Sequence, residues 1–279
     1  MKKINHIQLK NPYLTIILFL TFFIFSFLGA GNIIIVSIIG ICLCLLGLLQ
    51  GSVKLDLWIF IPLFLYNIIS LISGYKVYGN TITGFSSIQF IFPLVYLLVN
   101  YLQKNERYIL KMLCSLWVGI IAFLGIGEFI VEAFYGNASR ISGLLGNPNA
   151  MGAILMMGWF SIKSCLFKIE DDLIFKRILY FFESIILIAL SLTLSIGSFG
   201  ALGIGVIGMT LYGKQSFSYF LKQLSTIILS FACGLLLYIA GSYTNWFGLV
   251  VVILIYICLF SWYREKLNEC LSKYSVLPI

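Results

Sequence analysis

Charged side chains are scarce in this sequence. Only 10% of its 279 residues are Asp, Glu, Lys or Arg, whereas 61% are hydrophobic. A soluble globular domain carries about 25% charged residues, and no stretch here is both polar enough and long enough to form one. We therefore predict a single integral membrane domain over residues 1–279, an all-α polytopic bundle with the lipid bilayer as its partner.

Histidine is nearly absent, which excludes several classes of enzyme. The one histidine, His6, lies in a basic N-terminal tail, so neither a Ser-His-Asp nor a Cys-His set can form. The sequence also lacks a phosphate-cradling GxxxxGK[ST] loop, an HExxH motif and a cluster with metal-ligand spacing. We predict no metal and no cofactor, and we interpret the seven cysteines as buried thiols without a disulfide framework.

Long apolar runs are present instead. A spanning helix needs about 20 largely apolar residues, and about ten runs qualify. The run 178–212 is too long for one span, and we predict a break within it at the glycines of 197–200. The remaining predicted spans are 13–28, 33–49, 57–72, 85–102, 108–133, 150–167, 224–240 and 247–263.

The distribution of positive charge agrees with this number of spans. If the N-terminus is cytoplasmic, 16 of the 18 Lys and Arg residues fall on inner segments and only Lys76 and Arg140 fall outside. An excess of Lys and Arg is typical of the cytoplasmic loops of membrane proteins. Both termini are therefore predicted to be cytoplasmic, and the formal charge of +8 does not indicate a nucleic-acid partner.

The second half of the run 178–212 is rich in small residues. Small residues allow transmembrane helices to approach closely, so we predict close packing and no further role for this stretch. The residues concerned are Gly200, Ala201, Gly203, Gly205 and Gly208.

The most polar and least helical stretch of the chain begins at Arg140, on the predicted outer face. Asn147-Pro148 is typical of an N-cap followed by proline at the first helical position. The free N–H groups and positive dipole end of that helix would then point toward Arg140, which predicts an anion site. Gly143 and Gly146 would let the connecting backbone turn tightly beside a ligand.

Acidic residues near this stretch are further candidates. Glu128 and Glu132 are four residues apart, so they share one face of the predicted fifth helix, near its outer end. They could hold Arg140, act as a general base or bind a cation. Lys76 is the other outer cation, and Glu183 is interpreted as a polar contact inside the bundle.

These residues carry a resemblance to a known family. The segment Arg140-Ile-Ser-Gly-Leu-Leu-Gly-Asn-Pro-Asn-Ala-Met-Gly152 resembles the central motif of the O-antigen ligase and polymerase superfamily, R-x-S-G-x-x-x-N-P-N-x-x-G. The stretch 192–201 is similar to a second feature of that family, with its Thr, Ser, Gly and Ala but without its arginine. The family's large outer loop corresponds here only to residues 241–246.

The resemblance implies a metal-independent glycan transferase of the class C glycosyltransferase type. Its donor would be an undecaprenyl-diphosphate-linked glycan, and its acceptor a glycan or a lipid-linked molecule, at the outer face of the inner (cytoplasmic) membrane. Arg140 would bind the diphosphate and stabilise it as it leaves, and Glu128 or Glu132 is our own hypothesis for the base that deprotonates the acceptor. The predicted substrate-binding residues are Ser142, Gly143, Gly146, Asn147, Pro148, Asn149, Lys76 and Ser198.

Three alternatives remain open at this stage. An O-antigen ligase would move the glycan to lipid A core, whereas the polymerase that we favour joins repeat units of an O-antigen or capsule. The missing arginine and the short outer loop are also compatible with an inactive member of the family. A transporter would require acidic residues near the middle of the membrane, and Glu183 is the one weak candidate.

Overall fold

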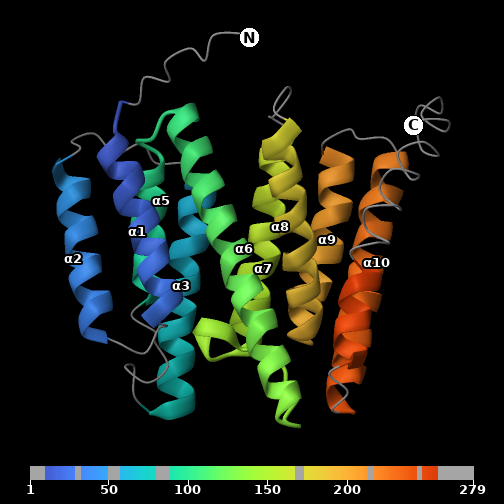
Figure 1. Ribbon diagram of the computed structural model, residues 1–279. Coiled ribbons are helices and arrows are strands. Elements are labelled where there is room, and N and C mark those ends of the chain that lie inside the picture. The colour runs from blue at the N-terminus through green and yellow to red at the C-terminus, as the bar shows by residue number, and fades with distance from the viewer. Residues whose placement is uncertain are drawn as a thin grey trace. The chain divides into compact units, whose positions relative to one another are not determined.

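The computed structural model describes residues 10–28, 33–49, 57–79, 88–166, 173–212, 217–243 and 247–256. Every regular element within these ranges is a helix, which confirms the all-α prediction (Figure 1). By its internal contacts the chain divides into two compact units, Met1–Cys114 and Ser115–Ile279. The boundary falls inside one long helix, α6 (Lys104–Phe134).

The first unit is built around the short helix α5. Its core contains the buried leucines Leu14, Leu18, Leu43, Leu98 and Leu102. Helix α5 packs against α1, α2 and α3. The bounds of the helices are Pro12–Leu28 for α1, Ile33–Leu49 for α2, Leu57–Tyr78 for α3, Ile88–Val99 for α5 and Lys104–Phe134 for α6.

A buried carboxylate fixes the start of α6 in this unit. Glu106 is fully buried, and its side chain accepts a hydrogen bond of 2.8 Å from the backbone N–H of Gln103. A glutamate that reaches back from the third helical position in this way satisfies one of the unpaired N–H groups at a helix start. The same carboxylate accepts the backbone N–H of Asn11, just before α1.

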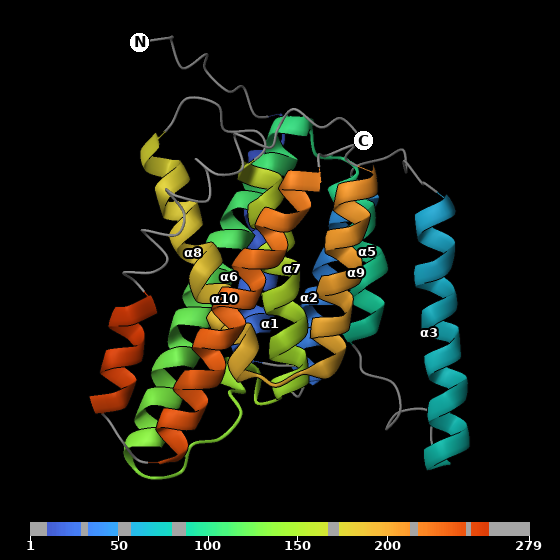
Figure 2. The ribbon, with the colours of Figure 1, turned by 90° about the vertical axis from the view of Figure 1, so that its right-hand side faces the viewer.

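The second unit contains the rest of α6 and a group of helices in mutual contact. Helix α7 packs against α8 and α9, and α10 packs against the same two helices (Figure 2). Trp159 and Leu155 of α7 are fully buried at the centre of this unit. The elements are the 3₁₀ turn η2 (Gly143–Leu145), α7 (Pro148–Leu166), α8 (Leu173–Leu192), α9 (Ile196–Tyr212), α10 (Phe217–Ser242) and a further helix, Phe247–Tyr256.

Two of the described helices are long and apolar enough to cross a membrane. They are α6 and α10. Four shorter apolar helices, at Pro12–Phe27, Ile38–Leu49, Ile196–Leu211 and Phe247–Tyr256, accompany them. The length and composition of α6 and α10 therefore support association with a membrane. The ten membrane spans expected from the sequence remain a prediction.

The predicted break in the run 178–212 is displaced in the structure. Helix α8 ends at Leu192 and α9 begins at Ile196, so Gly197 and Gly200 lie in the first turns of α9 and do not form the break. The cause is Leu194, whose φ of 48° is incompatible with a continuing right-handed helix. Lys76 also differs from expectation, because it lies in the last turn of α3 and not in a loop.

The cysteines are not all buried. Cys165 and Cys233 are buried as predicted, and Cys114 is half-buried. Cys42 and Cys44 are exposed on α2, which contradicts the prediction for these two. Cys258 and Cys270, together with the predicted helical residues 85–87, 167 and 257–263, lie outside the described residues.

Close packing through glycine occurs, but mostly outside α9. Within α9 only Gly205 faces a near neighbour, since an added Cβ would lie 2.8 Å from a ring carbon of Phe160. Gly203 has nothing within 4 Å, because it lies beside an apolar cavity of about 510 Å³ between α9 and α10. The tighter contact is in α10, where a Cβ on Gly234 would overlap the hydroxyl of Ser191 and lie 2.7 Å from its Cβ.

We predict that Gly234→Ala destabilises the second unit. The added methyl group has no room between α10 and α8, and overpacking of this kind costs about 1–3 kcal/mol. The matched control is Gly203→Ala, where the methyl enters open space and the helix gains about 0.5–1 kcal/mol. Thermal unfolding of the purified protein should place Gly234→Ala below wild type and Gly203→Ala at or above it, and equal melting temperatures would contradict the packing described.

Candidate functional site

The start of α7 is capped as the sequence predicts. The side-chain oxygen of Asn147 accepts the backbone N–H groups of Asn149 at 2.9 Å and Ala150 at 3.3 Å. Pro148 occupies the first helical position, where its missing N–H has no cost. Because Asn147 already occupies these two donors, the helix end offers fewer N–H groups to an anion than predicted, although its dipole remains.

The turn before α7 depends on two glycines. Gly143 and Gly146 have φ values of 54° and 63°, in the left-handed region that disfavours residues with a Cβ. The backbone N–H of Gly146 closes the turn on the carbonyl of Gly143 at 3.2 Å. The predicted tight turn is therefore confirmed.

Arg140 contacts the carboxyl-terminal end of α8. Its Nε donates to the carbonyl of Thr193 at 2.8 Å, and its Nη2 donates to the carbonyl of Leu194 at 3.3 Å. The backbone N–H of Ile141 donates to the carbonyl of Leu192 at 3.3 Å. Three consecutive carbonyls at the end of α8 are thus satisfied by residues 140 and 141, and a cation here complements the negative end of the helix dipole.

These carbonyls are accessible because α8 stops abruptly. The hydroxyl of Thr193 donates back to the carbonyl of Leu190 at 2.7 Å and accepts the backbone N–H of Ser195 at 3.3 Å. Leu194 between them adopts the left-handed conformation, which is costly for a residue other than glycine. The break therefore turns polar backbone groups toward Arg140.

The guanidinium of Arg140 retains donors for a ligand. Its Nη2 also donates to Oδ1 of Asn149 at 3.2 Å, which connects it to the first turn of α7. For Nη1, the structure records no partner among the described residues, and the side chain is exposed. Arg140 is therefore held in place by two of its nitrogens, while the third can donate to an anion.

Glu128 and Glu132 hold the segment around Arg140 against α6. The backbone N–H of Gly143 and the hydroxyl of Ser142 lie within hydrogen-bonding reach of the Glu128 carboxylate. The hydroxyl of Ser139 donates to Glu132. Of the described residues, neither carboxylate forms an ion pair with Arg140, so both act on it through the backbone that they anchor.

Ser198 and Lys76 are placed differently from the rest of the predicted site. Ser198 is buried, with its hydroxyl 3.0 Å from that of Ser195. A Cβ on Gly152 would lie 2.7 Å from the Ser198 hydroxyl oxygen, so Gly152 allows α7 to approach the α8–α9 junction. Lys76 is exposed and belongs to the first unit, whereas Arg140 belongs to the second.

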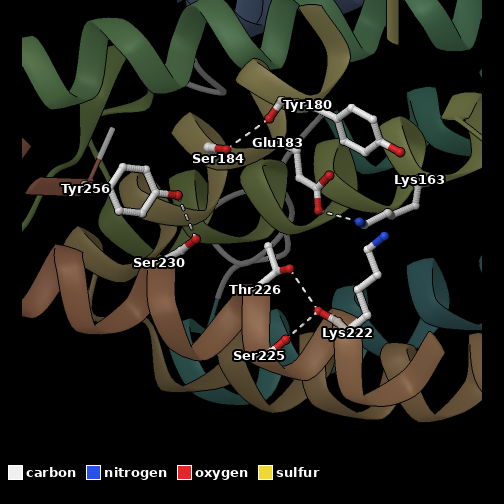
Figure 3. Close-up of polar contacts among 9 residues, drawn as sticks. All are labelled: Lys163, Tyr180, Glu183, Ser184, Lys222, Ser225, Thr226, Ser230 and Tyr256. Carbon is white, nitrogen blue, oxygen red and sulfur yellow. Dashed lines mark hydrogen bonds and ion pairs between the residues drawn. The ribbon is translucent and has the colours of Figure 1, made fainter. Parts of the chain in front are cut away.

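An ion pair that we did not predict lies at the other end of α7. Lys163, which the sequence places on an inner segment, is buried and pairs with Glu183 of α8 (Figure 3). The interpretation of Glu183 as a polar bundle contact is therefore confirmed. The sequence contains a signal for this pair, because Lys163 is the one cation of the apolar run 150–167 and Glu183 is the one carboxylate of the run 178–212. No local pattern shows that these two side chains are in contact.

No protein-family model, curated protein or solved structure matches this chain. Among the described residues there is also no group of three or more His, Cys, Asp or Glu side chains that could hold a metal ion. The function is therefore inferred from the arrangement of the residues themselves.

We predict that Asn147→Ala lowers the stability of the second unit. The substitution removes the acceptor for two backbone N–H groups, and loss of such a cap costs about 1 kcal/mol, or about 2–4 °C in Tm. Asn147→Asp is the control, because it keeps an acceptor and adds a negative charge near the positive end of α7. If Asn147→Asp unfolds at as low a temperature as Asn147→Ala, the cap is not the stabilising contact.

Proposed function

We propose that this chain is a glycan transferase of the O-antigen ligase and polymerase superfamily. Its donor would be an undecaprenyl-diphosphate-linked oligosaccharide, and it would polymerise repeat units of an O-antigen or capsule. One observation carries the proposal. The two segments that resemble features of this family are 140–152 and 192–201. They meet in the structure through the hydrogen bond from Arg140 to the carbonyl of Thr193, although these two residues are 53 positions apart in the sequence.

The proposal includes a location in the membrane. The chain would span the inner (cytoplasmic) membrane about ten times with both termini cytoplasmic, and the Arg140 site would face outward. This is supported by the 16-to-2 distribution of Lys and Arg. It is also supported by the apolar helices α6 and α10.

The proposed reaction is a displacement at the anomeric carbon of the donor sugar. An acceptor hydroxyl oxygen forms the new bond to that carbon, and the bond from the carbon to the diphosphate oxygen breaks with its electron pair. The Nη1 donors of Arg140 and the positive end of α7 would stabilise the charge that develops on the diphosphate. The proton of the hydroxyl passes to a carboxylate.

Glu128 and Glu132 are our candidates for that carboxylate. Both project from α6 toward the segment that carries Arg140, as their contacts with Ser139, Ser142 and Gly143 show. A base must lie within hydrogen-bonding reach of the proton that it takes. The carboxylate that serves as base would keep its anchoring contact and receive the proton on a remaining oxygen lone pair, while the other carboxylate would only hold the segment in place.

We predict that Arg140→Ala abolishes chain extension. Loss of one preorganised donor to a developing negative charge costs about 10²–10³ in rate. The measurement is the length of surface glycan on a gel, in a strain that lacks the gene and carries either version at equal expression. Wild type should restore a ladder and Arg140→Ala single units, whereas Arg177→Ala, which removes an exposed cation of α8, should behave as wild type.

Other outcomes of this experiment would change the proposal. If wild type restores whole chains on their acceptor but never affects their length, the protein is a ligase. If wild type has no effect on surface glycan, the chain is an inactive member of the family or a transporter. The arginine missing from 192–201 is the observation that favours inactivity.

We predict that the double variant Glu128→Gln, Glu132→Gln loses glycan transfer. Glutamine keeps the hydrogen-bonding shape of each side chain but cannot take a proton at neutral pH. The single variants should separate the two roles, since only the residue that serves as base should reduce the rate alone. Full transfer by the double variant would show that neither carboxylate is the base.

A further inference from the structure

A second polar site lies at the opposite end of α7 from Arg140. Lys163 and Glu183 form an ion pair with side chains only 8% and 3% exposed. The ammonium of Lys163 also lies 5.2 Å from the centre of the Trp159 ring. Lys163 is fifteen residues beyond Pro148, which corresponds to about 22 Å along a helix, so this cluster is separate from the Arg140 site.

A small cavity opens beside this ion pair. Its volume is about 140 Å³, and it lies where α7, α8 and α10 meet. A pocket for a drug-sized ligand is about 300–1,000 Å³, so this cavity can take only a small group. Its lining consists of Lys163, Leu166, Tyr180, Tyr219, Lys222 and Gln223.

The described charges at the cavity are predominantly positive. Lys163 of α7 and Lys222 of α10 both line it, and both side chains are drawn in Figure 3. Glu183 is the one carboxylate that pairs with this lining among the described residues. Two cations that line one small cavity favour an anion as its occupant.

Gln223 contributes a buried polar atom without a partner to the lining of the cavity. Its side chain is buried, with only 4% of the residue exposed, and its Oε1 has no hydrogen-bond partner among the described residues. A buried amide oxygen without a partner is costly. An amide can turn either its oxygen or its NH₂ group toward a ligand, so a group with both acceptor and donor oxygens would satisfy it.

We propose that this cavity binds a phosphate group, either as a free phosphate ion or as the headgroup of an anionic phospholipid. Lysine is a common phosphate ligand, and Tyr180 and Tyr219, which also line the cavity, each carry a hydroxyl group that can donate a hydrogen bond. Basic pockets between helices on the cytoplasmic side of a membrane bind anionic headgroups. This site does not depend on the glycan-transfer activity, because it uses none of the same residues, but binding of a lipid headgroup rests on the proposed membrane topology.

The test compares two sources of phosphate on the purified full-length protein. In one arm, thermal unfolding in detergent is followed while inorganic phosphate is added, with sulfate-free chloride buffer as reference. In the other arm, the protein is placed in nanodiscs of phosphatidylcholine with or without phosphatidylglycerol, and retained lipid is identified by mass spectrometry. Stabilisation in the first arm assigns a free ion, and selective retention of phosphatidylglycerol in the second assigns a headgroup.

Lys222→Gln is the diagnostic variant, and Arg177→Gln is its matched control. Lys222 lines the cavity, whereas Arg177 is an exposed cation of α8 that does not. Loss of a charge-assisted hydrogen bond should weaken binding about 10-fold or more, so Lys222→Gln should lose the response that Arg177→Gln keeps. Tyr219→Phe, which removes one hydroxyl and preserves volume, gives the same test if Lys222→Gln does not fold.

The proposal has clear contrary outcomes. If neither phosphate nor phosphatidylglycerol binds to wild type, the cavity is not a phosphate site. If Lys222→Gln and Tyr219→Phe respond as wild type does, binding occurs elsewhere. If Arg177→Gln loses the response as completely as Lys222→Gln, the effect is general surface charge and the proposal is wrong.

Discussion

The second unit depends on the contact between the guanidinium of Arg140 and the end of α8. That contact joins the polar connection before α7 to the break between α8 and α9, through the carbonyls of Thr193 and Leu194. Hydrogen bonds to a charged group are worth about 1.5–3 kcal/mol each. They offset the cost of holding Leu194 in the left-handed conformation, and Gly152 lets α7 come close enough to complete the junction.

The same side chain therefore serves a structural and a functional requirement. An arginine presents its donors in a rigid fork, so two nitrogens can be fixed by protein oxygens while the third faces outward. A lysine could neutralise charge but could not meet both requirements with one geometry. At the Arg140 site, one side chain thus both holds the structure and offers a donor to a ligand. The cavity near Lys163 is different, because its two cations belong to separate helices and the buried carboxylate of Glu183 already pairs with Lys163.

Features fixed by neighbouring residues were predictable from the sequence, and features fixed by distant ones were not. The cap at Asn147 and the turn at Gly143 and Gly146 follow from local chemistry, and the structure confirms them. The break in 178–212 was predicted at its glycines, yet it lies at Leu194, beside the carbonyls that Arg140 contacts. Arg140 was identified as unusual, but its carbonyl partners lie 53 and 54 residues away, and no local pattern reports them.

The most direct test of the Arg140 site is equilibrium binding of undecaprenyl diphosphate to the purified protein in nanodiscs, compared with undecaprenyl monophosphate. The account predicts that wild type prefers the diphosphate, and that Arg140→Lys weakens this binding about 10-fold or more while the monophosphate is little affected, as expected for a lost charge-assisted contact. Unchanged diphosphate affinity in a folded Arg140→Lys protein would contradict it. Arg140 would then serve only to hold the end of α8.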